Sequence, residues 1–488
     1  MQKPRSISQE LSVFLYFCMI GILNLQSSLF CDTIERYIKL PGRAQRRIIL
    51  IGHIWRMQPM STLSSLSNQE LCTLKDRLLN KYHDFQAQGL NLNMSRGKPS
   101  AEQLDLSIPI LTCIDSRETC LAEDGTDCRN YGSLDGLPEM KRLFAEIMEV
   151  QPANIVIGGN SSLTMMYDTI ARAMQFGILG NTPWGKLEKV KFLCPVPGYD
   201  RHFSITEAFG IEMIPVQMLD DGPDMAVVRK YVENDPTVKG IWCVPKYSNP
   251  EGKTYSDTVV DAFASLKPAA ADFRIFWDNA YCLHHLNEKH DELKNILEAC
   301  TAQGHADMVF IFASTSKITF PGAGVAAMAA SESNIADIKK RIFFQTIGPD
   351  KLNQLRHVRF FKNRAGMETH LVKHAAIIGP KFALVDEILT AELAGLGIAK
   401  WTKPNGGYFI SFDAMEGCAT RIVELCKEAG LCTTPAGSTF PYHHDPCDCN
   451  IRIAPTMPPL DELRSAIPLF TLCVKLASVE KLLAHAGA

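Results

Sequence analysis

The chain has 488 residues, of which 46% are hydrophobic and 21% are charged, a composition ordinary for a globular protein of two or three domains. It excludes a fibrous or intrinsically disordered protein. Fifty basic residues against fifty-three acidic ones leave a net charge of −3, so no overall field favours nucleic acid or an anionic membrane as a partner. The 16 cysteines lack the paired spacing of a disulfide framework, which favours reduced thiols and a cytoplasmic location.

Residues 1–59 differ in pattern from the rest of the chain. The run Leu11–Leu23 is mostly apolar but is shorter than the roughly 20 residues of a membrane span. Lys3 and Arg5 precede it, so the run also fits the core of a signal peptide. Met60 opens a stretch that is typical of a cytosolic N-terminus. We therefore expect residues 1–59 to be an extension outside the fold.

The globular part begins with a predicted amphipathic helix. Ser67 and Glu70 form a capping box, and apolar residues then recur at helical spacing. The segment SRGKPS, residues 95–100, contains glycine and proline, so it is either a plain connector or a loop that approaches a ligand closely. The segment YGSLDG, residues 131–136, predicts a turn before a helix near 138–150.

A short strand, two glycines and two serines come next. Residues 154–157 (NIVI) predict the strand, Gly158 and Gly159 turn the chain, and Ser161 and Ser162 precede a long helical pattern. Free backbone N–H groups, the helix dipole and two hydroxyls would then converge on one anion-binding point. Serines are also common helix caps, so the pattern alone leaves that simpler interpretation open.

Three further apolar runs are each followed by a polar motif. They are residues 190–194 before PGYDRH (197–202), residues 240–244 before NPEG (249–252), and residues 273–277 before DNAY (278–281). Apolar strands that alternate with helical patterns predict an α/β fold, with a mainly parallel sheet between two layers of helices. Ligands of such sheets bind beyond the carboxyl ends of the strands, so we expect these motifs to face one pocket.

A lysine follows the next predicted strand. Residues 308–313 form a short apolar run that ends at Ser-Thr-Ser-Lys, residues 314–317. A lone lysine in a loop usually extends its ammonium group to solvent. A lysine that burial or a nearby cation keeps neutral can instead act as a nucleophile and form a Schiff base, and the neighbouring motifs favour this interpretation for Lys317.

The pattern changes after about residue 350. Helices are predicted near 365–395 and 419–429 and at the end of the chain, and strands at 408–412 and 450–454. We expect a second, smaller α+β domain. The predicted limits are 60–115 for an N-terminal arm and part of the small domain, 116–355 for the large cofactor-binding domain, and 356–488 for the small C-terminal domain.

These motifs together supply what pyridoxal 5'-phosphate needs from a protein. Lys317 would carry the cofactor as a Schiff base, and Asp278 would keep the pyridine nitrogen protonated. Asn249 and Tyr281 would donate hydrogen bonds to the phenolate oxygen of the ring, and Tyr199 would stack on the ring. We predict that Lys317, Asp278 and Tyr281 are the catalytic residues.

The remaining predicted contacts are with the phosphate and the substrate. Ser161, Ser162 and Ser314 would hold the phosphate, and Arg452 would bind the substrate carboxylate with its planar guanidinium group. Singly, each such residue has a simpler interpretation as a helix cap, a turn residue or a surface ion pair. Their joint occurrence in this order favours the cofactor site.

From about Met60 to its end the chain resembles the fold-type I, class I aminotransferases, and most closely the Ic subgroup of aspartate aminotransferases. The motifs that carry the resemblance are SRGKPS, YGSLDG, GGNSS, PGYDRH, NPEG, WDNAY, STSK, PNGGYF and NIRIAPT. The resemblance implies a homodimer in which Tyr131 reaches the phosphate bound by the neighbouring subunit. It also implies that Gly97 offers its backbone to the substrate carboxylate.

The resemblance implies a ping-pong transaminase that moves the amino group of L-aspartate to 2-oxoglutarate. An aromatic or 2-aminoadipate aminotransferase, or a β-lyase of the same fold, is the alternative. A transcription regulator with an aminotransferase-like half is a more distant alternative for the function, because residues 1–59 are apolar and lack the basic helix-turn-helix pattern of a DNA-binding domain.

Two questions stay open at this point. Most class I relatives have a phosphate-binding arginine shortly after the lysine, whereas residues 318–325 contain none. The group for the second carboxylate of a dicarboxylic substrate is also unassigned, with Lys351, Arg356 and Arg359 as candidates. We expect no metal site, since the loop 443–449 (HHDPCDC) has zinc-binding residue types without a second cysteine pair and is more typical of a polar loop.

Overall fold

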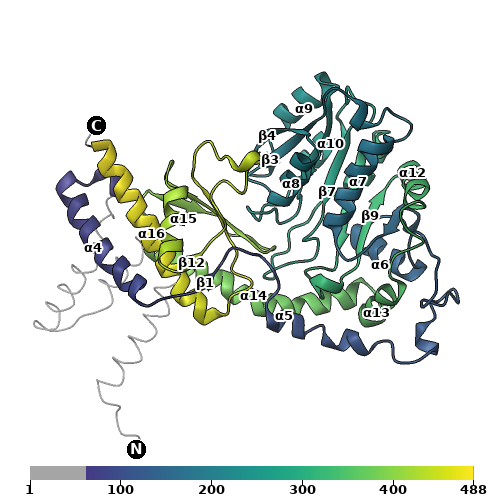
Figure 1. Ribbon diagram of the computed structural model, residues 1–488, viewed down its shortest axis with the longest axis horizontal. Helices are drawn as coiled ribbons and strands as arrows, with labels where there is room; N and C mark the ends of the chain where they lie inside the picture. The colour runs from purple at the N-terminus through teal and green to yellow at the C-terminus, as the bar shows by residue number, and fades with distance from the viewer. Residues whose placement is uncertain (1–61, 487–488) are drawn as a thin grey trace, which may run out of the picture. The chain divides into compact units, whose positions relative to one another are not determined.

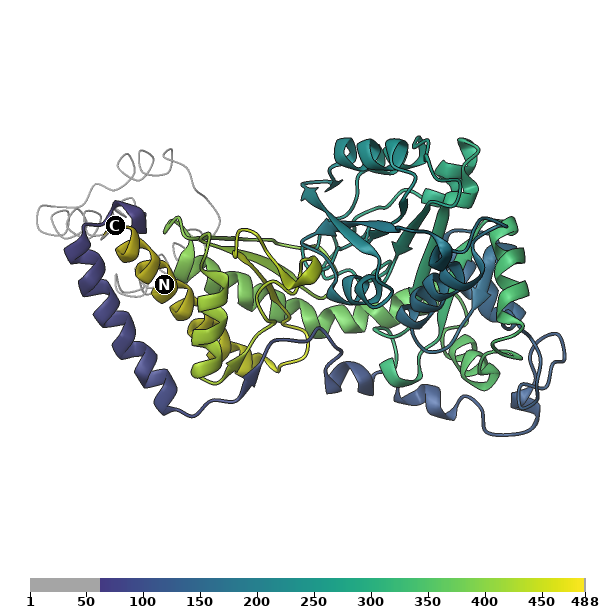
Figure 2. The same ribbon diagram turned by 45° about the horizontal axis from the view of Figure 1, so that its top comes forward.

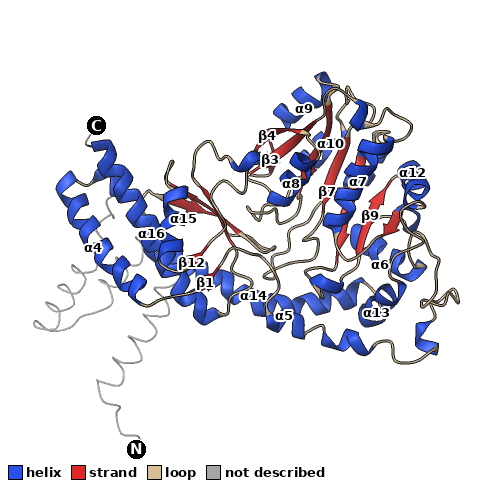
Figure 3. Cartoon of the chain, viewed as in Figure 1, coloured by secondary structure: helices blue, strands red, loops and turns tan. Residues whose placement is uncertain are grey.

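An eight-stranded sheet occupies the middle of the chain (Figures 1 and 3). The computed structural model describes residues 62–486, so the expected extension 1–59 lies outside the described residues. The strand order is β2-β9-β8-β7-β6-β3-β4-β5. The strands are β2 (Ile155–Ile157), β3 (Lys191–Val196), β4 (Glu212–Leu219), β5 (Gly222–Pro223), β6 (Val238–Cys243), β7 (Arg274–Asp278), β8 (Val309–Ser314) and β9 (Ala326–Ala330).

The strand directions bring the predicted motifs to one edge of this sheet. Strands β4, β3, β6, β7 and β8 are parallel neighbours in that order. Strand β9 is antiparallel to β8, and β2 is antiparallel to β9, so β2 runs in the same direction as β8. The carboxyl ends of β2, β3, β6, β7 and β8 therefore all face the same side, as the sequence predicts.

Helices cover both faces of the sheet, which is why its central strands are continuous apolar runs. Ile155 and Ile157 of β2 face one helical layer, and Val156 between them faces the other. The first layer contains α6 (Pro138–Met148), α9 (Met225–Asn234), α10 (Asp257–Ala264), α11 (Ile296–Ala302) and α13 (Lys351–Phe361), and the second contains α7 (Ser162–Phe176), α8 (Asp200–Ala208) and α12 (Glu332–Ile342). The predicted α/β fold is confirmed.

A second hydrophobic core forms around a small antiparallel sheet of order β10-β11-β13. Its strands are β10 (Ala399–Trp401), β11 (Ile410–Ala414) and β13 (Asn450–Ile453), and its helices are α14 (Arg364–Leu393), α15 (Ala419–Glu428) and α16 (Leu460–Ala486). Helix α4 (Asn68–Ala87) lies along α16 (Figure 2). The chain after α4 adds β1 (Leu92–Asn93), which pairs with β12 (Leu431–Cys432), and then α5 (Ala101–Asp105).

Helix α4 begins at the predicted capping box, in which the Ser67 hydroxyl and the Glu70 carboxylate each accept the other residue's backbone N–H.

The expected division between residues 355 and 356 falls inside α13. Leu355 and Phe361 of this helix belong to the core beside the eight-stranded sheet. The domain limits stay a prediction. Among residues 62–486, no helix has the length and apolar character needed to cross a bilayer.

Candidate active site

A cavity of about 650 Å³ lies at the carboxyl edge of the eight-stranded sheet, where it meets the small sheet. The predicted site residues that line it are Gly97, Ser161, Ser162, Tyr199, Asn249, Asp278, Tyr281, Ser314, Lys317 and Arg452. These residues come from seven separate segments of the chain. Tyr131 does not line the cavity of its own chain, and its side chain is 81% exposed.

Lys317 follows strand β8, as the sequence predicts. Its Nζ lies 4.7 Å from the centroid of the Tyr281 ring, in a cation–π arrangement. Burial lowers the pKa of Lys317; Asp278 opposes this effect and Arg452 adds to it. An amine with a lowered pKa is the form of lysine that can act as nucleophile or base near neutral pH.

A buried histidine holds the loop that carries this lysine. His357 Nδ1 lies 2.7 Å from the carbonyl oxygen of Asn353, so Nδ1–H donates this bond. Nε2 lies 2.9 Å from Thr319 Oγ1 and 3.3 Å from Thr315 Oγ1, and these threonines flank Lys317. Burial lowers the pKa of His357 to about 4, so the ring is neutral near pH 7. No sequence signal pointed to this residue.

Asp278 ends strand β7 and is buried. Its Oδ2 lies 3.1 Å from His202 Nε2, and the His202 ring stacks on Trp242 with 4.4 Å between centroids and 9° between planes. Its Oδ1 is buried without a hydrogen-bond partner among residues 62–486. A buried acceptor left unpaired is costly and points to a donor that a ligand would supply. The sequence pattern assigns His202 no role of its own, although this residue follows Tyr199 at the i,i+3 spacing of one helix face.

Two tyrosines frame the cavity beside Asp278. Burial raises the pKa of Tyr199 above its usual value, and the nearby charges of Asp278 and Asp200 add to this effect. Burial likewise raises the pKa of Tyr281 well above its usual value. Both side chains therefore stay neutral near pH 7. Their hydroxyls are available as hydrogen-bond donors.

The serines predicted to bind the phosphate lie at the start of α7 and at the end of β8. Ser161 caps this helix by accepting the N–H of Leu163 at 3.2 Å. The Ser314 hydroxyl donates to Ser316 Oγ at 3.1 Å, and Ser316 Oγ donates to the carbonyl oxygen of Asn160 at 3.0 Å. The end of β8 is thus tied to the turn before α7. The helix dipole, the first N–H groups of α7 and the hydroxyls meet at the same part of the cavity.

Arg452 enters the cavity from strand β13. Its Nη1 donates to Asp200 Oδ1 at 2.9 Å and to Asn249 Oδ1 at 3.3 Å. The guanidinium carbon lies 4.8 Å from the centroid of the Phe409 ring, and Nε is buried without a hydrogen-bond partner in the described part of the chain. One edge of the guanidinium group is therefore fixed, while the edge that contains Nε remains available for a carboxylate. No local sequence pattern indicates the pairing of Arg452 with Asp200.

Gly97 packs against the aromatic ring that supports Arg452. A Cβ atom at this position would lie 2.3 Å from Cζ of Phe409, so only glycine fits here without a shift of the ring. The loop is held on both sides, because Thr434 Oγ1 donates to the carbonyl oxygen of Ser95 at 3.1 Å and Thr456 Oγ1 donates to that of Lys98 at 3.2 Å. The segment is therefore a fixed wall of the cavity, which favours the ligand-binding interpretation over that of a connector.

The three cations considered for a second carboxylate lie elsewhere in the chain's own fold. Lys351 Nζ donates to the carbonyl oxygen of Gly132 at 3.0 Å, and Arg356 Nε donates to Asn353 Oδ1 at 2.8 Å. Arg359 Nη2 donates to the carbonyl oxygen of Leu121 at 3.2 Å. None of the three lines the cavity.

The loop 443–449 forms a turn closed by a carboxylate. Asp445 accepts the backbone N–H groups of Cys447, Cys449 and Asn450 at 2.9–3.0 Å. Within residues 62–486, no three His, Cys, Asp or Glu side chains come together in a way that could hold a metal ion.

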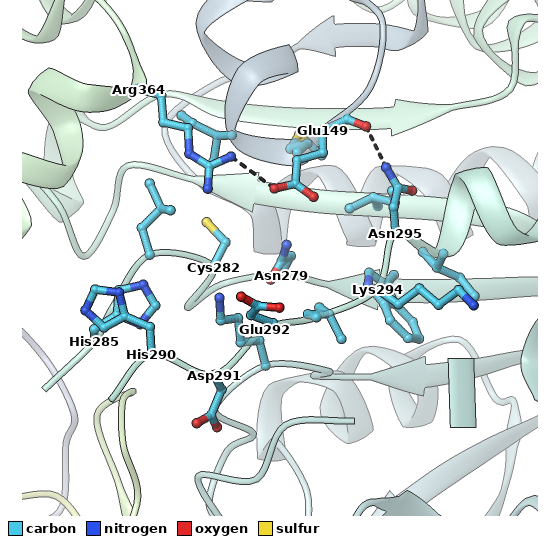
Figure 4. Close-up of a pocket in the computed structure, with 18 of the residues that line it drawn as sticks. Glu149, Asn279, Cys282, His285, His290, Asp291, Glu292, Lys294, Asn295 and Arg364 are labelled. Carbon is cyan, nitrogen blue, oxygen red and sulfur yellow. Dashed lines mark hydrogen bonds and ion pairs between the residues drawn. The ribbon is translucent and has the colours of Figure 1, made fainter. Parts of the chain in front are cut away.

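A second cavity, of about 360 Å³, lies beside the loop that follows Asp278 (Figure 4). The rings of His285 and His290 stack there with 3.7 Å between their centroids. Arg364, at its rim, pairs with Glu149 at 3.0 Å and with Glu368 at 2.8 Å. No predicted site residue lines this second cavity, whereas ten of them line the first.

Comparison with known proteins agrees with this geometry. The sequence model of the family described as aspartate amino-transferase matches residues 66–486. The chain belongs to this family. It is 43% identical over 430 residues to the aspartate aminotransferase of Corynebacterium glutamicum, with 87% of this chain and 99% of the relative covered.

Two solved structures support the same assignment. The crystal structure of an aspartate transaminase from Corynebacterium glutamicum is 43% identical and superposes with a TM-score of 0.84, over 86% of this chain and 99% of that chain. The structure of a Corynebacterium diphtheriae protein provisionally named an aminotransferase is 48% identical, with a TM-score of 0.81 over 83% of this chain and 100% of that chain. The protein is thus an aminotransferase of fold type I.

Membership in this aminotransferase family implies pyridoxal 5'-phosphate as cofactor, and the cavity fits such a group. The unpaired Oδ1 of Asp278 matches a protonated pyridine nitrogen. The start of α7 matches a phosphate, and Lys317, with its lowered pKa, lies in the same cavity.

Proposed function

We propose that this aminotransferase moves the amino group of L-aspartate to 2-oxoglutarate, which gives oxaloacetate and L-glutamate, by a ping-pong sequence at one site. The observation that carries the proposal is the meeting of Lys317, the free oxygen of Asp278 and the free edge of Arg452 in one cavity. The choice of aspartate is supported by the 43% identity to an aspartate aminotransferase.

The predicted residues would hold the cofactor from several sides. Lys317 would bind its aldehyde, Asp278 its ring nitrogen, Tyr199 its ring face, and Asn249 and Tyr281 its phenolate oxygen. Ser161, Ser162 and Ser314 would bind its phosphate together with the start of α7. When bound, the cofactor supplies an aldehyde that takes up the amino group and a ring that withdraws electrons from the substrate Cα.

The chain's own residues then orient the substrate and move its proton. The Nε edge of Arg452 would bind the α-carboxylate, and the backbone at Gly97 would border the same group. This leaves the substrate Cα near Lys317, whose amine would take and return the Cα proton. The lowered pKa of Lys317 keeps a fraction of the amine unprotonated for this task.

We further propose that the working unit is a homodimer in which Tyr131 reaches the phosphate site of the other subunit. Tyr131 is 81% exposed and lies outside the cavity of its own chain. Phe343, Phe344 and Ile347 expose further apolar surface, with 69%, 78% and 60% of their areas accessible. Apolar side chains exposed to this degree favour a protein partner.

The unpaired cysteines of residues 62–486 favour a reducing compartment, and we propose the cytoplasm.

A spectrophotometric titration of the purified protein with pyridoxal 5'-phosphate tests the function. Addition of L-aspartate is expected to remove the absorption of the lysine-bound cofactor, and 2-oxoglutarate is expected to restore it, with equal amounts of oxaloacetate and glutamate formed. Ammonia in place of glutamate would indicate a β-lyase. A response to aromatic or 2-aminoadipate donors but not to aspartate would contradict the proposed substrate.

A further inference from the structure

Lys317 belongs to a loop that is held from behind by a buried polar network outside the active-site cavity. The Tyr408 hydroxyl donates to the carbonyl oxygen of Lys317 itself at 3.1 Å. The next carbonyl oxygen, that of Ile318, lies 3.0 Å from His370 Nε2 and is also hydrogen bonded to His374. The main chain at the lysine and at the next residue is therefore fixed by side chains that do not line the cavity.

Gln103 lies at the centre of this network and is fully buried. Its Nε2 lies 3.0 Å from the Tyr408 hydroxyl and 3.0 Å from His374 Nδ1. Its Oε1 accepts the backbone N–H of Ser100 at 3.1 Å, in the capping box of α5. Because a backbone N–H can only donate, this bond fixes which end of the Gln103 amide is the oxygen. The Nε2 group then donates both of its hydrogens, one to Tyr408 and one to His374.

The orientation of the Gln103 amide decides the direction in which the Tyr408 hydroxyl donates. This hydroxyl already accepts a hydrogen from Gln103, so its own proton remains for the carbonyl oxygen of Lys317. Burial raises the pKa of Tyr408 above its usual value, so the proton stays on the hydroxyl near pH 7. The bond to Lys317 therefore depends on the amide of a residue more than 200 positions earlier in the chain.

His374 accepts the other hydrogen of the Gln103 amide and reports the same orientation. Burial lowers the pKa of His374 to about 4, so the ring is neutral near pH 7 and carries one proton. Since Nδ1 accepts from Gln103, this proton is on Nε2, which lies 3.1 Å from His370 Nε2. The tautomer of His374 thus shows which way the Gln103 amide points.

We propose that Gln103 and Tyr408 are positioning residues for Lys317, because they hold its carbonyl oxygen and so keep its amine in line with the substrate Cα. This inference deepens the proposed function and rests on it. Neither residue lines the cavity, so both act on the reaction through Lys317. A displacement of about 1 Å can slow a reaction about 100-fold. A small shift of the amine would therefore slow transfer of the Cα proton and leave substrate binding unchanged.

Tyr408→Phe removes the bond to Lys317 but keeps the ring, which packs against Tyr281 with 5.9 Å between centroids. We expect kcat with L-aspartate and 2-oxoglutarate to fall about tenfold, while KM changes less than about twofold. The kinetic isotope effect of L-aspartate deuterated at Cα should rise, because removal of this proton becomes slower than the other steps. A normal kcat, a raised KM, or a lower kcat with an unchanged isotope effect would overturn the proposal.

Gln103→Glu tests the orientation of the amide at nearly constant volume. The carboxylate would accept the N–H of Ser100, the proton of Tyr408 and a proton on His374 Nδ1, and three donors favour its ionised form. Because the Tyr408 hydroxyl then turns away from Lys317, kcat should fall about as much as in Tyr408→Phe. The double variant has no hydroxyl left to turn, so its kcat should lie within about twofold of that of Tyr408→Phe. Losses that multiply would show two independent effects and would overturn the proposal.

Tyr82→Phe is the matched control. It also removes a buried tyrosine hydroxyl that donates to a backbone carbonyl oxygen, that of Leu425, at 2.8 Å. This bond joins α4 to α15 and does not reach Lys317. We expect kcat, KM and the isotope effect of this variant to equal those of the wild type.

The ¹⁵N NMR spectrum of the histidine-labelled protein tests the network without any reaction. Protonated and unprotonated imidazole nitrogens differ in chemical shift, and His374→Gln identifies the signals of this ring. We expect the proton on Nε2 in the wild type and on Nδ1 in Gln103→Glu. A proton on Nδ1 of the wild-type ring would overturn the inference. If the wild type carried the proton on Nε2 but did not use aspartate, the proposed function would fail while the arrangement of Gln103 and Tyr408 stood.

Discussion

Arg452 Nη1 lies 2.9 Å from Asp200 Oδ1, and this ion pair joins strand β13 of the small sheet to helix α8 on the large sheet. The two residues are 252 positions apart in sequence. The pair fixes the arginine in place before a substrate binds, but it also neutralises part of the charge that attracts a substrate carboxylate. The two effects can be separated by substitution.

Asp200→Asn is expected to lower the KM for L-aspartate about three- to tenfold, because the asparagine can still accept the bond from Arg452 while the competing negative charge is lost. Asp200→Ala is expected to raise this KM, since it removes the bond that orients the guanidinium group. Steady-state kinetics of both variants give the comparison. Equal changes in the two variants would show that Asp200 does not act through orientation.

Gly97→Ala should disturb the same subsite from the opposite side. The new methyl group would lie 2.3 Å from Cζ of Phe409 and force the ring away from Arg452. We expect a loss of about 1–3 kcal/mol in unfolding free energy and a higher KM for all amino donors. Gly322→Ala is the control, because a Cβ there meets nothing within 4 Å. A Gly97→Ala protein with normal KM and stability would contradict the tight contact.

The buried histidine behind the lysine loop predicts sensitivity to acid. Burial lowers the pKa of His357 from 6.5 to about 4, so the unfolded chain takes up this proton first as the pH falls. The lowered pKa of His357 therefore adds to the free energy of unfolding in full above pH 6.5. This stabilisation, of about 3 kcal/mol at most, is lost as the pH falls toward 4. Urea unfolding at pH 7 and at pH 4.5 measures it. His357→Gln should be less stable at pH 7 but should lose less stability on acidification, and an unchanged loss would rule out His357 as a source.

Glu251 is expected to make stability depend on pH in the opposite direction from His357. Burial raises the pKa of its carboxyl from 4.5 to about 7, although Lys253 at 2.9 Å opposes this effect. Ionisation then costs the folded state more than the unfolded state, so stability falls as the pH rises from 4.5 through 7. Glu251→Gln should be more stable than the wild type at pH 8, by about 1–3 kcal/mol, and close to it at pH 5. Thermal unfolding of both proteins at pH 5 and pH 8 measures this difference. Equal stability of the two proteins at pH 8 would refute the raised pKa of Glu251.

The strands that the sequence predicts well are those buried on both faces. Strands β6, β7 and β8 are unbroken apolar runs of β-forming residues because helices cover both sides of them. Strand β9 (AAMAA) escaped prediction because alanine favours helices, and only its place between β2 and β8 makes it a strand. Strand β4 contains Pro215, which argues locally against a strand.

The site residues that can be predicted from the sequence are those that a local pattern places. Those that cannot be predicted depend on contacts between distant segments. Residues such as Lys317 and Asp278 directly follow predicted strands, so topology alone places them at the cavity. The partners Asp200, His202 and His357 act through contacts between segments far apart in sequence, which local patterns do not encode. Tyr131 lies outside the cavity of its own chain, so its predicted role depends on a second subunit.

In the proposed function, Lys317 binds the cofactor of this aminotransferase covalently. The most direct measurement is borohydride reduction of the protein with pyridoxal 5'-phosphate, followed by peptide mass spectrometry. We expect one phosphopyridoxyl group per chain, on the peptide that contains Lys317, and none on that peptide in Lys317→Ala. A phosphopyridoxyl group on another lysine, or none at all in the wild type, would contradict it.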